Sequence, residues 1–479
     1  MNGTTTHTPL DLSAFHGRSL AVLGLGVSGM SAASALRDAG AEVLPWDDQE
    51  TSRERAKSLG LTPTDLMDAD FSGIDALVLS PGIPHGHPRS HPMIERAREA
   101  GCEILCDLEL LTRVERDARY IGITGTNGKS TTTALIGHVL SELGIASAIG
   151  GNIGAPGLSL PALGAEGVYV LELSSYQLEL LPGAVCDISI LLNITPDHLD
   201  RHGGMSGYIA AKTRIFQGQR AGQTAIVGID DAPTRTIFDD LDKSSPATVV
   251  PLSVEKTCTG GVYVSDGWLI DDRDNNASPV LELTSLDALP GRHNAQNVAA
   301  AYAACTTVAN ATTDSDRNAV VAAIRTFPGL VHRQELVGFR DQVRFVNDSK
   351  ATNAEAAAHA LAAYDNIVWI AGGIAKDGGI TSLEPLFGRV RHAFLIGEAA
   401  DTFASTLDGR VAVTLSGDLA TALTQAMAEA ETDDEAVILL SPACASFDQF
   451  PSFEARGDAF RAAVTQLPGF APHTAGGAA

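Results

Sequence analysis

The stretch from Tyr120 to Thr133 constrains this chain more than any other, because it joins an apolar run to a helix-compatible segment through a glycine-rich turn. The glycines let backbone N–H groups converge on an anion, and the start of the helix adds the positive end of its dipole. Lys129 is then placed to reach the β- and γ-phosphates of a nucleotide, and the Ser130 hydroxyl to bind Mg²⁺. The order of strand, loop and helix therefore predicts an ATP site.

The spacing of this turn departs from the strict phosphate-loop motif. Counting back from Gly128, the first glycine of the motif would fall at Ile123, whereas the glycines present are Gly122 and Gly125. The alternative is a glycine-rich turn with an exposed lysine. The flanking strand and helix favour the phosphate loop.

Length, composition and net charge limit which class of protein this chain can belong to. A length of 479 residues predicts about three domains, and an apolar content of 44% is enough for large cores. The net charge of −25 argues against nucleic acid or an anionic membrane as the main partner. No apolar run is long enough to cross a bilayer, so no membrane insertion is expected. With six cysteines, no C-x-x-C pair and no visible signal peptide, the sequence predicts a soluble cytoplasmic protein.

Residues 1–106 have the pattern of a Rossmann-like domain. A short apolar strand at residues 19–23 runs into Gly24-x-Gly26-x-x-Gly29, and Asp47 follows the next expected strand. These glycines serve a nicotinamide dinucleotide or any other ligand with a diphosphate, so the motif alone leaves the ligand open. A later strand ends at a turn that contains Gly82, and ligands of doubly wound sheets bind at such strand ends.

The second expected domain, residues 107–328, carries the phosphate loop and two further candidate ligands. Asn152 lies in a glycine-rich turn, where its amide could face a ligand. Glu172 comes near the end of an apolar strand, and a buried strand rarely carries a carboxylate without a partner. An Mg²⁺ ion held by Ser130 would be such a partner. The alternative is a glutamate that forms a salt bridge or caps a helix.

A loop rich in Asp, His and Arg follows the strand expected at residues 188–192 and includes His198. Such a loop after a strand indicates a site. Lys212, Arg214 and Phe216 come next, on an expected helix.

The same domain also contains an expected hairpin and a long helix. Residues 262–270 with their Asp-Gly turn predict a β-hairpin at a sheet edge. The alanine-rich helix expected at residues 291–309 places Asn294 and Asn297 on one face. Their amides either contact an adenine or cap and pack the helix.

The third expected domain, residues 329–479, has three strands that each end in a polar loop of small residues. The loops lie at residues 347–353, 372–377 and 441–450. The strands of a parallel sheet end at one edge, so these loops should gather there. The tail from Ala471 is expected to be disordered.

Three hypotheses account for different parts of this pattern. A nicotinamide dehydrogenase explains the Gly24–Gly29 turn but leaves Lys129, Glu172 and His198 unexplained. A P-loop switch or motor leaves the polar loops of the third domain unexplained. An enzyme that uses ATP on a second, anionic substrate needs all of these features and is favoured.

The combined motifs resemble those of the Mur ligases of bacterial cell-wall synthesis. The resemblance covers nearly the whole chain in the family's order, and it is carried by residues 125–132, residues 171–175, Asp197-His198, Lys212, His332-Arg333 and residues 347–350. Two features favour the branch that adds D-glutamate. One is the Rossmann-like first domain, and the other is the stretch 441–450 with Phe453, where diamino-acid-adding members carry an Asn-Pro-Arg element.

The resemblance implies an α/β fold of three domains and a role for each matching residue. Catalysis would rest on Lys129, Glu172, His198 and Lys212, and two Mg²⁺ ions on Ser130, Glu172, His198 and a carbamylated Lys212. ATP would be bound by Gly125, Thr126, Asn127, Gly128, Lys129, Ser130, Thr131, Asn294, Asn297, Arg333 and Asp348. The nucleotide sugar would be bound by Val27, Ser28, Asp47, Gly82 and Asn152, and D-glutamate by Lys350, Thr352, Lys376, Ser446, Phe447 and Phe453.

The resemblance also implies the reaction and its partners. The substrates would be ATP, UDP-N-acetylmuramoyl-L-alanine and D-glutamate, joined through an acyl phosphate in peptidoglycan precursor synthesis, by a chain expected to be monomeric. The alternatives within the family are ligases that add L-alanine or a diamino acid, and folylpolyglutamate synthases.

Overall fold

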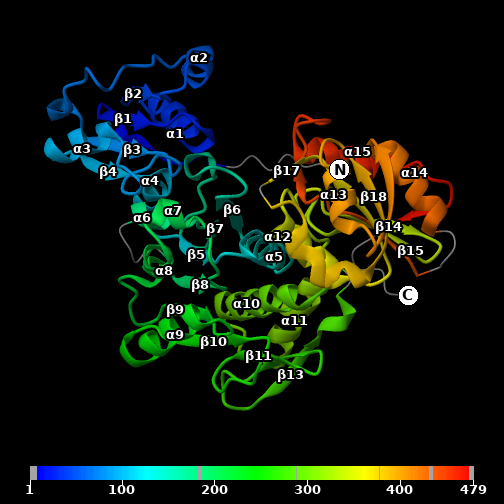
Figure 1. Ribbon diagram of the computed structural model, residues 1–479. Coiled ribbons are helices and arrows are strands. Elements are labelled where there is room, and N and C mark those ends of the chain that lie inside the picture. Colours follow the sequence, from blue (N-terminus) through cyan, green and yellow to red (C-terminus); the bar gives the residue numbers. More distant parts are fainter. Residues whose placement is uncertain (1–7, 182–185, 287, 377, 431–434, 474–479) are drawn as a thin grey trace. The chain divides into compact units, whose positions relative to one another are not determined.

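The computed structural model describes residues 8–181, 186–286, 288–376, 378–430 and 435–473 (Figure 1). Contacts divide the chain into two compact units, of which the first contains residues 1–281 and 296–324 and the second residues 282–295 and 325–479. Mainly parallel sheets alternate with helices in both units, which is the predicted α/β class. None of the helices in the described ranges has the length and apolar character needed to span a bilayer.

The first sheet is parallel throughout and has the strand order β2-β1-β3-β4. Its strands are β1 (Ser19–Leu23), β2 (Glu42–Trp46), β3 (Ala76–Leu79) and β4 (Glu103–Leu105), and its helices are α1 (Val27–Asp38), α2 (Glu50–Ser58), α3 (Pro92–Glu99) and α4 (Asp107–Val114). Successive side chains of a strand point to opposite faces. Leu20 and Val22 therefore join the core formed with α1, while Ala21 and Leu23 join the core formed with α3. Both faces are covered, as the Rossmann-like prediction requires.

The second sheet has nine strands in the order β13-β12-β11-β10-β9-β8-β5-β7-β6. Their bounds are β5 (Arg119–Thr124), β6 (Ser147–Gly151), β7 (Val168–Glu172), β8 (Ile188–Leu191), β9 (Thr224–Gly228), β10 (Thr248–Ser253), β11 (Val262–Ser265), β12 (Trp268–Asp271) and β13 (Ser278–Glu282). Strand β5 lies between β7 and β8, so the chain changes direction across the sheet at the phosphate loop. Ligands of parallel sheets bind at such a switch point.

The predicted hairpin is present as β11 and β12, and its turn has positive φ at both Asp266 and Gly267. Its expected place at the sheet edge is wrong, because β13 pairs beyond β12 and takes the edge.

The helices of this segment are α5 (Lys129–Glu142), α6 (Ser175–Leu180), α7 (Leu199–His202), α8 (Met205–Thr213), α9 (Ala232–Ser244), α10 (Arg292–Val308) and α11 (Asp314–Arg325). One helix prediction needs correction. Lys212 lies in α8, but this helix ends at Thr213, and Arg214 and Phe216 belong to a 3-10 turn that buries the phenyl ring.

The third sheet, in the second unit, has the order β19-β18-β16-β20-β15-β14-β22. It consists of β14 (Glu335–Arg340), β15 (Val343–Asn347), β16 (Ile367–Gly372), β18 (Val390–Ile396), β19 (Ala412–Gly417), β20 (Val437–Leu440) and β22 (Phe470–Pro472), with α12 (Ala354–Ala363), α13 (Ala400–Leu407), α14 (Leu419–Ala430) and α15 (Phe453–Thr465). Trp369 and Leu439 face α12 and α13, and Phe345 and Ile438 face α14 and α15. The neighbouring parallel strands β16, β20 and β15 bring the three predicted loops to one edge, and this expectation is confirmed.

The predicted disorder of the tail is wrong at its beginning. Ala471 and Pro472 continue β22, which pairs with β14, and the amide of His473 donates to the Val337 carbonyl. A short strand that covers an otherwise open sheet edge satisfies backbone groups that would need water. The rest of the tail, Thr474–Ala479, and Asp377 of the loop after β16 lie outside the described residues.

The expected domain boundaries fall between sheets. Strand β4 ends at Leu105 and β5 begins at Arg119, and β13 ends at Glu282 and β14 begins at Glu335. The boundaries at residues 106 and 328 stay predictions, since contacts group the first two sheets in one unit.

Candidate active site

The phosphate loop connects the end of β5 to the start of α5. Gly125 and Gly128 have φ of 154° and 86°, a region that side chains disfavour. A Cβ on Gly128 would also lie 2.2 Å from the Asn297 amide oxygen. Asn193, just after β8, holds the loop by two hydrogen bonds. Its backbone carbonyl accepts from the Thr126 amide, and its side-chain oxygen accepts from the Asn127 amide. The loop conformation therefore depends on glycine and on the neighbouring strand.

Two lysines enter this loop from different helices. Lys129 donates to the carbonyl oxygens of Gly125 and Thr126, at 2.8 Å each. Lys212, from α8, donates to the same Gly125 oxygen at 2.7 Å and is 1% exposed. Burial lowers the pKa of Lys212 well below its ordinary value, and the charge of Lys129 lowers it further. Lys212 is therefore a buried lysine and not a surface side chain.

Glu172 lies at the end of β7 with 1% of its surface exposed. Its Oε1 accepts a hydrogen bond of 2.7 Å from the Asn152 amide, and its Oε2 is buried without a hydrogen-bond partner. No ion pair among the described residues involves Glu172, and α6 is capped by Ser174 instead. The structure therefore contradicts the salt-bridged or capping alternative. A carboxylate oxygen in this state fits a cation ligand, because burial of an unpaired carboxylate is costly.

His198 comes from the loop after β8 and starts α7 with a positive φ of 50°. Its imidazole is half exposed, 3.4 Å from the Asp197 carboxylate and beside the Tyr176 ring. In the described part of the chain, no three His, Cys, Asp or Glu side chains gather closely enough to hold a metal. The predicted metal set, which includes a hydroxyl and a lysine, stays a prediction.

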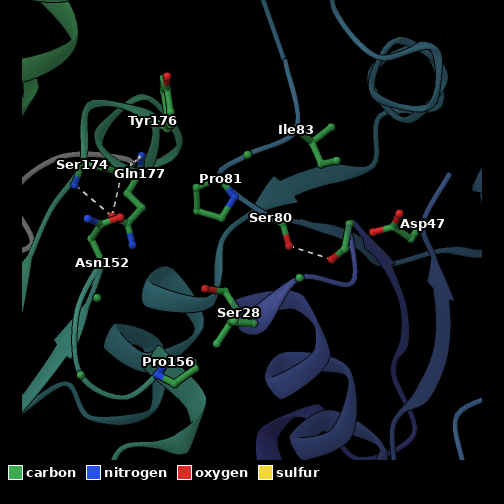
Figure 2. A pocket seen from close by; sticks show the side chains of 16 residues that line it. Ser28, Asp47, Ser80, Pro81, Ile83, Asn152, Pro156, Ser174, Tyr176 and Gln177 are labelled. Atoms are coloured by element: carbon green, nitrogen blue, oxygen red, sulfur yellow. Dashed lines mark hydrogen bonds between the residues drawn. The ribbon is translucent and has the colours of Figure 1, made fainter. Parts of the chain in front are cut away.

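A cavity of about 550 Å³ lies between the first sheet's glycine turn and the ends of β6 and β7 (Figure 2). All five residues predicted for the nucleotide sugar line it, namely Val27, Ser28, Asp47, Gly82 and Asn152. Figure 2 shows Ser28 and Asp47 on one wall and Asn152 with Gln177 on the other. The tertiary structure thus brings residues from four separate stretches to one cavity.

The glycine turn is shaped by close backbone approach. A Cβ on Gly29 would lie 1.9 Å from the Gly24 carbonyl oxygen and 2.5 Å from the Ser80 hydroxyl, which itself donates to that oxygen. A Cβ on Gly26 would meet no atom within 4 Å. Asp47 accepts from the amide of Leu25 at 2.7 Å, so its carboxylate also supports the turn.

Several lining residues were not predicted from the sequence. They are Pro156, Ser174, Tyr176 and Gln177, whereas Ser80, Pro81 and Ile83 belong to the turn with Gly82 that the sequence placed at a ligand-binding strand end. Ser174 and Gln177 do carry a signal in the sequence, because they form a capping box, a motif that marks the start of a helix. That motif indicates a helix but gives no hint of a ligand.

The predicted adenosine contacts are divided between the units. In the first unit, Asn297 accepts from the Thr132 hydroxyl at 3.2 Å. In the second, the Asn294 amide donates to the Pro290 carbonyl, and Asp348 accepts from the Ser441 hydroxyl and the Gln334 backbone amide. Arg333 forms an isolated β-bridge with Leu330. Burial raises the pKa of Asp348 to about 7.

The predicted D-glutamate residues lie on the loops at the edge of the third sheet. Lys350 and Thr352 follow β15, Lys376 follows β17 (Ile374–Ala375), Ser446 and Phe447 follow β21 (Cys444–Ala445), and Phe453 begins α15. Strands β17 and β21 pair and join two of the loops.

Two contacts connect these loops. In the first, the Lys350 ammonium lies 5.6 Å from the Phe453 ring centre. Phe447, by contrast, is 71% exposed. The buried guanidinium of Arg456, which the sequence did not single out, ties the loops together through Ser349 and the Cys444 carbonyl.

Comparison with known proteins identifies relatives that match nearly the whole chain. Residues 123–305 match the model of the Mur ligase middle domain. A UDP-N-acetylmuramoylalanine--D-glutamate ligase of Caulobacter vibrioides is 50% identical over 98% of both chains, and one of Paramagnetospirillum magneticum is 51% identical over 94% of this chain and 96% of that one.

Solved structures show the same fold at low identity. MurF from Acinetobacter baumannii superposes with a TM-score of 0.55 at 20% identity, covering 75% of this chain and 79% of that one. UDP-N-acetylmuramate-alanine ligase MurC from Thermotoga maritima gives 0.53 at 18% identity, covering 92% and 98%. With the full-length relatives at half identity, the chain belongs to the Mur ligase family, among its UDP-N-acetylmuramoylalanine--D-glutamate ligases.

Proposed function

We propose that this chain uses ATP to join D-glutamate to UDP-N-acetylmuramoyl-L-alanine, with release of ADP and phosphate, in peptidoglycan precursor synthesis. The observation that carries the proposal is the position of Lys129, Lys212 and Glu172 at the phosphate loop, next to a cavity that Asn152 shares with the glycine turn. A phosphate donor and a nucleotide-linked acceptor can then meet at one place.

The reaction needs two transfers. The L-alanyl carboxylate attacks the γ-phosphorus of ATP, forming an acyl phosphate and ADP. The amine of D-glutamate then attacks the acyl carbon, and phosphate leaves as the amide forms and the amine releases a proton. Both steps depend on charge neutralisation and positioning more than on covalent catalysis. Lys129 would neutralise the β- and γ-phosphates, and the loop amides would orient them.

The residues present fit bound Mg²⁺. Ser130 and Glu172 would hold one ion, with the unpartnered Oε2 of Glu172 as a ligand, and His198 and Lys212 would hold a second. When bound, Mg²⁺ would neutralise phosphate charge. Lys212 would act as a carbamate, formed when its neutral amine adds CO₂ and releases a proton. Its burial and lowered pKa favour the neutral amine that this addition needs.

The remaining assignments follow the same proposal. Asn294, Asn297, Arg333 and Asp348 would contact the adenosine. The residues around the cavity would bind the uridine diphosphate sugar. Lys350, Thr352, Lys376, Ser446, Phe447 and Phe453 would bind D-glutamate. The chain would have domains at residues 1–106, 107–328 and 329–479 and would act as a cytoplasmic monomer, where ATP is available.

A ligation assay with a panel of amino acids tests this function. Purified protein, ATP, Mg²⁺ and UDP-N-acetylmuramoyl-L-alanine should release ADP with D-glutamate and not with L-alanine, a diamino acid or L-glutamate. Release with a diamino acid, or with UDP-N-acetylmuramic acid and L-alanine, would favour another Mur-type ligase. ADP release that needs no acceptor would favour a switch.

A further inference from the structure

We infer that Arg201 is a positioning residue for the nucleotide-sugar substrate, and that it acts by fastening the loop of residues 80–87 to the opposite wall of the cavity. The inference rests on the proposed function for the identity of the substrate. The fastening itself rests on contacts within the first unit. We name residues 80–87 the lip loop, since Ser80, Pro81, Gly82 and Ile83 line the cavity.

The Arg201 guanidinium is directed into the lip loop. It donates to the carbonyl oxygens of Ile83 at 3.3 Å and His87 at 3.4 Å, and it lies 3.1 Å from Nδ1 of His85. The residue itself is 8% exposed. The buried guanidinium of Arg201 therefore contacts three residues of a loop that follows a strand of the first sheet.

The other side of the guanidinium is held by helix α6. Its carbon lies 5.0 Å from the centre of the Tyr176 ring, and one nitrogen lies 3.6 Å from the Glu179 carboxylate. Glu179 also pairs with His85 at 3.1 Å and with His202 at 2.9 Å. Arg201 and Glu179 thus form one connected group that joins the lip loop to α6 and α7.

Close backbone approach supports the same docking. Gly203, with a positive φ of 69°, follows α7, and a Cβ at this position would lie 2.8 Å from Nε2 of His87. A larger residue would push the lip loop away. The contact is therefore built for a small residue beside a histidine of the lip loop.

The group also reaches the cavity. Tyr176, which stacks on Arg201, and Ile83, which accepts from it, both line the cavity, and Figure 2 shows them on opposite sides of it. Release of the lip loop should therefore widen the cavity and lower the affinity for the nucleotide sugar. The phosphate loop is held by Asn193 and should keep its affinity for ADP. Loss of charge-assisted hydrogen bonds of this kind corresponds to about 10- to 100-fold in affinity.

The test compares Arg201→Lys with Arg214→Lys in the full chain. Lysine keeps the charge but lacks the planar fork that binds several acceptors. Arg214 is a matched control, because it donates to the Leu178 and Leu181 carbonyls at the end of α6 and, among the described residues, forms no hydrogen bond or ion pair with the lip loop. Hydrogen exchange of residues 80–87 without ligand, UDP affinity and ADP affinity are measured for the parent and both variants.

Arg201→Lys should speed hydrogen exchange of the lip loop and lower the affinity for UDP about 10- to 100-fold. The affinity for ADP should change less than about twofold. Arg214→Lys should leave all three measurements near the parent. His85→Ala removes the lip-loop side chain that contacts Arg201 and Glu179. This variant should also speed exchange of the lip loop and weaken UDP binding, and it replaces Arg201→Lys if that variant does not fold.

The inference is overturned if exchange of the lip loop and UDP affinity stay at parental values in both Arg201→Lys and His85→Ala. It is also overturned if UDP and ADP affinity fall together. A parent that binds no UDP would instead reject the proposed function, and the exchange data would still decide whether Arg201 fastens the loop.

Discussion

The ammonium groups of Lys129 and Lys212 share one acceptor, the carbonyl oxygen of Gly125, at 2.8 and 2.7 Å. Two positive charges on one neutral oxygen repel each other, and the repulsion is strongest where water is excluded. Lys212 is the more deeply buried of the two, so it is the group whose charged form is disfavoured. Its neutral amine is the species that reacts with CO₂, which connects this geometry to the proposed carbamate.

Lys212→Ala should lose most of the ligase activity, and acetate or formate should restore part of it. The variant removes the carbamate oxygens, and a short carboxylate can occupy the space that the side chain leaves. Activity is measured as ADP release dependent on D-glutamate, with increasing carboxylate. Parental activity in the variant, or no restoration at any carboxylate concentration, would reject the carbamate role.

Lys129→Ala should abolish ADP formation while the fold is retained. The lysine stabilises charge that develops on the transferred phosphate, and loss of one such contact costs roughly 3–4 kcal/mol. Turnover measured beside a circular dichroism spectrum separates catalysis from unfolding. Acetate should not restore this variant, which makes it the control for Lys212→Ala. Near-parental turnover would show that the loop is not the ATP site.

Gly29→Ala should lose thermal stability, whereas Gly26→Ala should lose affinity for UDP. The Cβ at position 29 would clash with the Gly24 carbonyl, so this variant should lose thermal stability. The Cβ at position 26 meets no protein atom, so that variant should keep its stability and lose affinity for UDP, whose diphosphate needs the open backbone. Thermal unfolding and UDP titration measure the two effects. Equal stability of both variants would contradict the close approach.

The glycine turn at residues 24–29 should bind the uridine nucleotide and not NADH. The phosphate loop already supplies the ATP site, and the acceptor still needs an anion cradle. Calorimetric titration of UDP and of NADH into the full chain checks this. Tight NADH binding without UDP binding would support the dehydrogenase hypothesis.

Asp348→Asn should change how stability depends on pH. The folded state holds the Asp348 proton up to about pH 7, whereas the ordinary pKa of an aspartate is 3.8. Between these values the folded state binds more protons than the unfolded state, so this group lowers the free energy of unfolding as pH rises. From pH 5 to pH 8 the loss should be on the order of 2–3 kcal/mol.

Asparagine cannot ionise, so the variant should lack this loss. The melting temperature of the parent relative to Asp348→Asn should therefore fall between pH 5 and pH 8. A constant difference across that range would show that Asp348 is ionised throughout.

Local patterns determined the secondary structure around the site. The strands at residues 19–23 and 76–79 and the helix after Gly128 follow from apolar runs and glycine turns, because these features act within a few residues. The type I′ hairpin turn likewise follows from Asp266-Gly267 alone. The family resemblance indicated the reaction and the residues that would carry it out.

Tertiary structure decided which of those residues meet. Periodicity predicts that a residue lies in a strand, but pairing between distant strands sets which strand ends become neighbours. That pairing placed β5 between β7 and β8, brought Lys212 to the Gly125 carbonyl and left one oxygen of Glu172 unpartnered. It also turned the start of the expected tail into β22, because the open edge of β14 accepts a further strand.

The same reason explains what the sequence alone did not indicate. The loop rich in Asp, His and Arg that includes Arg201 indicated a site, but it did not indicate that Arg201 binds the His87 carbonyl, which lies 114 residues away along the chain. Arg456 carries no local signal, and its partner Ser349 lies 107 residues away. By itself the sequence determined the elements, the phosphate loop and the family. Only the folded chain decided the cavity wall, the burial of Lys212 and the docking of the lip loop, because burial and charge depend on neighbours that folding brings together.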